Sequence, residues 1–374
     1  MRGRSRDDDQ GNAMGRNIVL CFDGTSNKYS YANTNVVKLY ALLDRQDPDQ
    51  LSYYQPGIGT IPPVGMLGAV WKRVVKYADL AFAILLEQHV EDGYRFLMRY
   101  WQPGDHVYIF GFSRGAYTAR VLAGMLHKVG LLTAGNEELI PFAWNMYRGK
   151  IGDKLYLDFA STFSRPVGIH FLGLWDTVSS VGLATHPESF QYTRGNPSVA
   201  TVRHAVSLGE RRRQFVQNLW VDPPPPGQDL KQVWFSGEHC DVGGGYYEFR
   251  SGLSKITLQW MVREAEAAGL RTNAAMVAKT FPAVSNEDQA APDPAAEIHD
   301  SLSGLWWIVE YLPLPRKVAP VPPATKWTTR WQLHKGALRF VKNGAQVHES
   351  VRQRMQRVPD YKPGNLPQNP DWVD

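Results

Sequence analysis

The chain has 374 residues, of which 43% are hydrophobic and 12 are tryptophan, enough for one large α/β domain or two smaller ones. Its formal net charge of +5 is mild, and with no dense Lys/Arg run it excludes a chain built to bind nucleic acid. The basic triplet at residues 211–213 is interpreted as a solvated helix end. Two cysteines, Cys21 and Cys240, cannot form a disulfide framework or a zinc cluster, so we expect reduced, buried thiols.

The ends of the chain carry no targeting signal that we recognise. There is neither a secretory apolar segment nor a run long enough to span a bilayer. We therefore expect a soluble, cytoplasmic chain, and delivery elsewhere by a secretion route without a signal peptide stays open. Residues 1–15 are charged and aperiodic, hence expected to be disordered. We expect a single domain over 16–356, with possible cap segments near 61–86 and 297–316, and a loose tail over 357–374.

The first buried strand is predicted over residues 17–22, an apolar run. Asp23, Gly24 and Thr25 follow it, at the strand end where open α/β sheets place ligands. The backbone N–H groups of Gly24 and Thr25 could form an oxyanion hole, with Asp23 ordering the loop. Alternatively Asp23 is a phosphatase nucleophile, or the loop is a structural turn. A phosphatase of this kind needs a second aspartate two residues after the first, where this chain has threonine.

The next elements alternate between helix and strand. A helix is predicted over 33–43, a strand over 51–55 and a second helix over 86–101. Residues 61–86 between them are apolar and dotted with glycine, and form either a cap helix pair or ordinary core. The alternation is typical of a parallel sheet with helices on both faces.

A strand, a serine turn and a helix follow at residues 106–129. Residues 107–110 are apolar without alternation, as in a parallel strand buried on both faces. The turn, at residues 111–115, reads G-x-S-x-G with Ser113 at its centre, and a helical pattern covers 116–129. This context favours a nucleophile elbow over a glycine turn without chemistry. Side chains at positions 111 and 115 would crowd the neighbouring strand and helix.

Two candidates for the remaining catalytic roles lie downstream. After a helix over 137–147, a strand over 167–175 ends at Asp176, where a serine hydrolase of this fold needs its acid. A helix is predicted over 201–210, and the last strong strand over 232–235 leads to His239. The order serine, aspartate, histidine is that of α/β-hydrolases. Other residues could take the basic or the acidic role: His170, His299 and His348, or Asp241, which more simply ties its own loop.

Four motifs in this order, NIVLCFDGTSN, GFSRGAYTAR, FLGLWDTVSSVG and FSGEHCDVGGGY, resemble the DUF2235 family of α/β-hydrolases. That family includes the catalytic domain of one class of type VI secretion phospholipase effectors. The likeness covers about residues 17–355, although this chain reads His-Cys-Asp where His-Ser-Asp is expected. The resemblance implies an α/β-hydrolase-like, mostly parallel sheet with cap or lid insertions. It also implies a triad of Ser113, Asp176 and His239 that acts on carboxylic esters, which in the effector members are phospholipid esters.

The predicted reaction passes through an acyl-enzyme on Ser113 and needs no metal or cofactor. The backbone N–H of Arg114, with that of Gly24 or Thr25, would hold the oxyanion. We expect a lipid or phospholipid ester as substrate. A small-molecule esterase or thioesterase, an inactive hydrolase fold that binds a partner, and a phosphatase based on Asp23 are the alternatives.

The C-terminal third carries the candidate for membrane contact. Residues 301–314 are apolar and contain Trp306 and Trp307, which form either a core helix or a lip that touches lipid. A hairpin or strand pair is predicted over 327–341. If the protein is an effector, an immunity or delivery protein is a possible partner. The sequence does not predict an oligomeric state.

Overall fold

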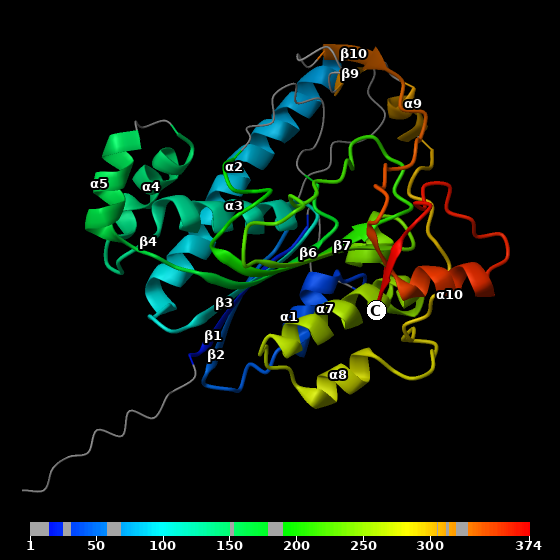
Figure 1. Ribbon diagram of the computed structural model, residues 1–374, viewed down its shortest axis with the longest axis horizontal. Helices are drawn as coiled ribbons and strands as arrows, with labels where there is room; N and C mark the ends of the chain where they lie inside the picture. Colours follow the sequence, from blue (N-terminus) through cyan, green and yellow to red (C-terminus); the bar gives the residue numbers. More distant parts are fainter. Residues whose placement is uncertain are drawn as a thin grey trace, which may run out of the picture.

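A parallel sheet carries the fold in the computed structural model (Figure 1). The structure describes residues 15–24, 31–57, 69–149, 153–178, 190–304, 306–311, 314–318 and 328–374. Within them the sheet has eight strands: β1 (Asn17–Phe22), β2 (Gln50–Gln55), β3 (His106–Phe112), β6 (Ile169–Trp175), β7 (Val199–Ser207), β8 (Asp229–Phe235), β11 (Gln346–His348) and β12 (Asp371–Val373). Every neighbouring pair is parallel, which confirms the α/β class.

The helices and the smaller elements surround this sheet. The helices are α1 (Asn35–Leu42), α2 (Ala69–Tyr100), α3 (Arg114–Val129), α4 (Ile140–Tyr147), α5 (Asp153–Phe163), α6 (His239–Gly243), α7 (Gly252–Ala267), α8 (Ala274–Thr280), α9 (Trp306–Glu310) and α10 (Glu349–Arg357), with 3-10 turns at Glu137–Leu139 and Glu248–Arg250. Two antiparallel pairs join β4 (Leu131–Leu132) to β5 (Ser164–Arg165) and β9 (Leu314–Val318) to β10 (Thr328–Gln332).

Both faces of the sheet are buried, because successive side chains of a strand point to opposite sides. In β1, Leu20 and Phe22 pack into a core with residues of α2, α3 and α4. Val19 and Cys21 pack into a second core with residues of α1 and α7. Figure 1 shows the first group of helices on one side of the sheet and α1, α7 and α8 on the other. The unbroken apolar runs that predicted buried strands have this cause.

The strand order is β12-β11-β8-β7-β6-β3-β1-β2. The direction in which the chain moves across the sheet, from one strand to the next, reverses at β1, while all strands stay parallel. The chain crosses from β1 to β2 at one edge and then returns to β3 on the other side of β1. The register pairs Phe22 with Gly111 and Phe112 with Trp175, so the carboxyl ends of these strands lie level. Such a reversal point is where open α/β sheets bind ligands.

Several predictions about individual elements need correction. Residues 201–210, predicted as a helix, belong mainly to the central strand β7. Residues 371–373, expected in a loose tail, form the edge strand β12.

The segment 61–86 is predicted as either a cap helix pair or ordinary core. Its residues 69–86 form the beginning of the single helix α2 and not a pair of helices, and 61–68 lie outside the described residues.

Residues 327–341, predicted as a hairpin or strand pair, contribute only one strand, β10. This strand pairs with β9, which precedes that range. Residues 1–14, most of the segment expected to be disordered, also lie outside the described residues.

Candidate active site

Ser113 lies in a tight turn between β3 and α3, held in a strained conformation. Its φ of 58° and ψ of −120° are values that residues other than glycine rarely adopt. A Cβ atom at Gly111 would lie 2.6 Å from the carbonyl oxygen of Gly115, and one at Gly115 would lie 2.2 Å from that of Phe22. Both glycines are therefore needed for the close approach of β1, β3 and α3 around the serine.

Replacing Gly115 with alanine is expected to lower the free energy of unfolding by about 1–3 kcal/mol, because the new methyl group would overlap the backbone of β1. Urea denaturation of the purified proteins measures the change. Gly168→Ala is the control: its new Cβ would lie 3.9 Å from the carbonyl oxygen of Ser198, an ordinary van der Waals contact, so its stability should stay within about 0.5 kcal/mol of wild type. Equal stability of both variants would contradict the packing described for the turn.

The structure brings together Ser113, His239 and Asp176, which come from three distant parts of the chain. His239 Nε2 lies 2.8 Å from Ser113 Oγ, and His239 Nδ1 lies 2.6 Å from Asp176 Oδ2. All three side chains are buried. An ionised aspartate only accepts hydrogen bonds, so Nδ1 carries the proton and Nε2 is free to accept one from the serine hydroxyl.

His239 is fixed by the turn at the start of the short helix α6. Glu238 and Asp241 form a reciprocal capping box around it: the Glu238 side chain accepts the backbone N–H of Asp241, and the Asp241 side chain accepts that of Glu238. The imidazole packs between two aromatic rings, Phe112 at 4.6 Å and Phe215 at 4.8 Å between ring centroids. The ring therefore has little freedom to turn away from Ser113.

Asp176 follows β6 with a positive φ of 37° and is fully buried. Its Oδ1 accepts the backbone N–H of Ser207 at 2.9 Å. Arg339 donates to both oxygens, from Nη1 to Oδ1 at 2.5 Å and from Nη2 to Oδ2 at 3.0 Å. Sequence reasoning missed Arg339, which stands in the C-terminal third with no motif around it.

These contacts set the charges of the pair. Burial lowers the pKa of His239 below its ordinary value of 6.5, although the hydrogen bond and charge of Asp176 oppose that change. Burial alone would raise the pKa of Asp176, but the charge of Arg339 and the hydrogen bond from His239 hold it well below its usual range. At neutral pH the site therefore holds a neutral imidazole beside a carboxylate.

The sequence predicts that this site hydrolyses esters, and these charges predict how the rate of that reaction would depend on pH. A general base must be unprotonated, so kcat/KM is expected to fall with decreasing pH only as His239 takes up a proton. Because its pKa is lowered, the midpoint of that fall should lie below about pH 6.5. The rate of cleavage of a soluble p-nitrophenyl ester, measured at constant ionic strength, gives the midpoint. A midpoint above about pH 7 would contradict the environment described for His239.

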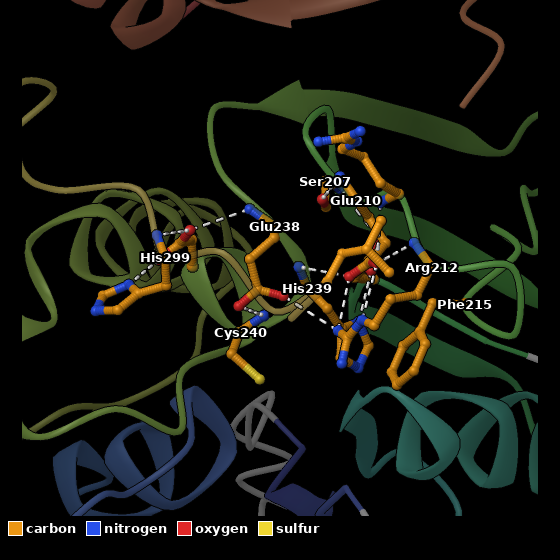
Figure 2. A network of polar contacts seen from close by, with 12 residues as sticks. Ser207, Glu210, Arg212, Phe215, Glu238, His239, Cys240 and His299 are labelled. Carbon is orange, nitrogen blue, oxygen red and sulfur yellow. Dashed lines mark hydrogen bonds and ion pairs between the residues drawn. The ribbon is translucent and has the colours of Figure 1, made fainter. Parts of the chain in front are cut away.

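A buried ion cluster lies directly beside His239 (Figure 2). Arg212 pairs with Glu210 at 2.7 Å and with Glu238 at 3.1 Å, and its guanidinium lies 3.7 Å from the ring centre of Phe215. Glu210 also accepts the backbone N–H of His239 at 3.3 Å. The prediction that the basic triplet at residues 211–213 is a solvated helix end was wrong. The triplet lies in an irregular loop, and the Arg212 side chain is only 9% exposed.

The pKa values of the two glutamates of the cluster shift in opposite directions. Burial alone would raise the pKa of Glu210, but its hydrogen bond and ion pair with Arg212 lower it. Burial raises the pKa of Glu238, since Arg212 offsets only part of that effect. Glu210 is the anion that neutralises Arg212, and Tyr246 donates to Glu238 at 2.6 Å.

Asp23 binds its own loop. Its Oδ1 accepts from the backbone N–H of Gly24 at 2.6 Å and from Thr34 Oγ1 at 2.8 Å, and its Oδ2 accepts from Tyr54 at 2.8 Å. Thr34 in turn caps α1. These contacts fit the ordering of a loop better than the attack of a phosphatase nucleophile. Thr25 lies outside the described residues.

The other candidate bases and the second candidate acid make contacts elsewhere. His170 bonds through Nε2 to the carbonyl oxygen of Ala268. His348 caps α10 and bonds to Ser350. Asp241 accepts from His299 Nδ1 at 2.6 Å, and with the capping box it ties its own loop, as the sequence predicts. No hydrogen bond is recorded from any of them to Ser113.

Trp306 and Trp307 begin the short helix α9 and are half-buried. Trp306 packs edge to face on Phe215, with 6.1 Å between ring centres, so aromatic rings run from His239 through Phe215 to Trp306. Trp307 lies under the guanidinium of Arg211. The helix expected over 301–314 is thus shorter than predicted, and its first tryptophan belongs to the surroundings of the site.

Three further observations concern the described part of the chain. Cys21 and Cys240 are both free thiols, the first buried and the second partly so. Among the described residues, no group of three His, Cys, Asp or Glu side chains is arranged to hold a metal ion. None of the helices described combines the length and the apolar character needed to cross a bilayer.

Comparison with known proteins assigns the chain to a family. Residues 16–264, about two thirds of the chain, match the family described as "T6SS, Phospholipase effector Tle1-like, catalytic domain". An uncharacterized protein of Saccharomyces cerevisiae, YEL023C, is 42% identical over 230 residues, which cover 57% of this chain and 34% of that protein.

Two solved structures are similar at lower identity. One is the crystal structure of an uncharacterized protein from Pseudomonas aeruginosa, with 23% identity and a TM-score of 0.40 over 69% of this chain and 46% of that one. The other is the Tle1 effector bound to the VgrG spike of the type 6 secretion system, with 20% identity and a TM-score of 0.35 over 64% and 53%. The chain thus spans about a third of the yeast relative and about half of the solved chains.

Proposed function

Because the chain belongs to the family of Tle1-like phospholipase effector catalytic domains of the type VI secretion system, we propose that it is a serine hydrolase that cleaves the carboxylic esters of lipids. The observation that carries the proposal is the hydrogen-bonded row from Ser113 Oγ through His239 to Asp176, with separations of 2.8 Å and 2.6 Å. Phospholipids are the preferred substrate class, on the ground of family membership.

In the proposed mechanism His239 Nε2 takes the hydroxyl proton of Ser113 while the serine oxygen attacks the ester carbonyl carbon. Asp176 holds the imidazole in the productive tautomer and stabilises the imidazolium. The tetrahedral intermediate collapses, the ester C–O bond breaks, and the imidazolium gives its proton to the departing alcohol. Water then attacks the acyl carbon while His239 takes one of its protons. The bond between that carbon and Ser113 Oγ breaks, the imidazolium returns the proton to the serine oxygen, and the carboxylic acid is released.

The oxyanion needs hydrogen-bond donors next to the serine. We propose the backbone N–H of Arg114, which begins α3, because partial positive charge gathers at a helix N-terminus. The N–H of Thr25 is the second proposed donor. That of Gly24 bonds to Asp23 instead, so Asp23 and Gly24 together shape the loop. Each such donor is typically worth about 3–4 kcal/mol of transition-state stabilisation.

The aromatic row beyond His239 supports a lipid substrate. Phe215 and Trp306 offer apolar surface that begins at the catalytic imidazole, and we propose that an acyl chain runs along it. Trp306 and Trp307 would then also contact the membrane surface, where tryptophan is favoured. Family membership makes a delivery or immunity protein part of the proposal as well.

A substrate panel tests the proposed class. Vesicles of phosphatidylcholine, phosphatidylethanolamine and phosphatidylglycerol are compared with short soluble p-nitrophenyl esters and with p-nitrophenyl phosphate. Release of fatty acid from vesicles is the expected result. Cleavage of soluble esters alone would mean a small-molecule esterase. Cleavage of the phosphate would move the chemistry to Asp23, and no turnover of any substrate would mean an inactive fold.

A further inference from the structure

Arg339 reaches Asp176 from outside the part of the chain that matches the family, residues 16–264. It stands in an irregular segment before β11, and 7% of the residue is exposed. Besides its two bonds to Asp176, its guanidinium donates to the carbonyl oxygen of Ser207 at 3.1 Å and to that of Phe215. Arg339 thus connects the carboxylate to the backbone of Ser207 and of Phe215. Phe215 borders the site, since its ring packs on His239.

The segment that carries Arg339 is itself anchored. The backbone carbonyl oxygen of Arg339 accepts from Asn365, which also donates to the carbonyl oxygen of Leu208 after β7. Three residues earlier, Gly336 donates its N–H to the buried Glu310 at 3.2 Å and accepts from Arg211 at 2.9 Å. The arginine is therefore held in place from both of its sides.

We propose that Arg339 is a positioning residue for the reaction. Its two N–H groups that donate to Asp176 hold the carboxylate in place against His239. Its positive charge also reduces the electrostatic stabilisation that the carboxylate gives to the protonated imidazole. This inference rests on the proposed function. In a triad without such a cation, the imidazole faces an uncompensated carboxylate, which favours its protonation. Burial and the charge of Arg212 already lower the pKa of His239, and the guanidinium of Arg339, by offsetting the charge of the carboxylate, should lower it further.

Other charged or titratable groups also face His239, and they must be kept constant in any test. Among the described residues they are Asp176 at the end of β6, Glu210 and Arg212 in the loop after β7, Glu238 and Cys240 beside it in the chain, and Asp241 in α6. A substitution at Arg339 leaves all of these side chains in place, although the guanidinium also lowers the pKa of Asp176 and of Glu210. A shift in the protonation of His239 then reports the loss of the guanidinium, acting directly or through these two carboxylates.

The test compares Arg339→Gln and Arg339→Lys with wild type in the pH profile of kcat/KM. Arg339→Gln should move the acid midpoint up by about one pH unit, because the carboxylate loses its cation. Arg339→Lys keeps the positive charge but cannot donate two parallel hydrogen bonds to Asp176, so the acid midpoint of kcat/KM should stay near that of wild type. Both variants should lose activity on the plateau, by about 10- to 100-fold for the glutamine, because the imidazole is less well oriented.

Arg354→Gln is the matched control. Arg354 is a buried arginine of α10 that donates to the backbone carbonyl oxygens of Pro294 and Ala296. It should lose stability without moving the midpoint. If Arg339→Gln leaves the midpoint unmoved while wild-type hydrolysis depends on Ser113, the inference falls and the proposed function stands.

Removing one partner of a buried ion pair can prevent folding, so a second comparison uses two charge-matched proteins, wild type and the double variant Asp176→Asn/Arg339→Gln. The imidazole of His239 is titrated by NMR in both. If the guanidinium offsets the charge of the carboxylate, removing both groups should leave the midpoint within about half a pH unit of wild type. A midpoint about one unit or more lower in the double variant would mean that the carboxylate acts on the imidazole without compensation, and would overturn the inference. This readout does not depend on whether any ester is hydrolysed.

Discussion

Replacing Ser113 with alanine is expected to lower kcat for ester hydrolysis by roughly 10⁴- to 10⁶-fold, the range found when a triad nucleophile is removed. The physical reason is that the only oxygen hydrogen-bonded to His239 Nε2 among the described residues disappears. No acyl-enzyme can then form. The fold should remain, because a methyl group fits where the hydroxymethyl group stood.

The measurement is fatty acid release and p-nitrophenol release under identical conditions, with near-ultraviolet circular dichroism to show that the fold is intact. Ser254→Ala is the control, since Ser254 is a buried serine of α7 whose hydroxyl donates to the carbonyl oxygen of Ser251. It should retain wild-type kcat. Hydrolysis at the wild-type rate in Ser113→Ala would remove the proposed mechanism.

The second large effect is expected at Asp176. Changing it to asparagine should lower kcat about 10⁴-fold near neutral pH, as in other triads, because an amide stabilises the wrong imidazole tautomer. The variant also leaves Arg339 without its anion, so the free energy of unfolding should fall by several kcal/mol, about 3–5 as for other broken buried pairs. Steady-state kinetics and urea denaturation measure the two effects separately.

Asp241→Asn distinguishes the two candidate acids. Asp241 bonds to His299 and to the backbone of Glu238, so its loss should disturb the loop and reduce kcat far less than the loss of Asp176. If the order is reversed, with Asp241→Asn the more damaging in a folded protein, the acid role belongs to Asp241.

Most of the sheet could be predicted from the sequence, because buried parallel strands read as unbroken apolar runs. The nucleophile elbow was also predictable, because its strand, turn and helix are contiguous in the sequence. The short strands β11 and β12 were not predicted, and the central exception is β7. Its Arg203 and His204 look like the polar positions of a helix, but Arg203 pairs with Glu264 and Asp229, and His204 bonds to Gln232. These partners lie far along the chain, and pairing with β6 and β8 decides the conformation.

The contacts around the candidate triad were only partly predictable. Ser113, Asp176 and His239 each follow a recognisable strand, so their meeting at one edge could be expected from a parallel sheet. Arg339 and Arg212 follow no such rule. Each is buried beside carboxyl groups that composition does not point to: Asp176 for Arg339, and the neighbouring Glu210 with the more distant Glu238 for Arg212. Composition and periodicity contain no signal for such pairs.

Whether the Ser113 hydroxyl is made nucleophilic by the histidine 126 positions away is tested most directly by covalent labelling. Wild type and His239→Gln are treated with a fluorophosphonate, digested, and mapped by mass spectrometry. We expect one adduct, on the peptide that contains Ser113, formed rapidly by wild type and scarcely at all by the variant. An adduct on another residue, or equal labelling of Ser113 in both proteins, would contradict this account.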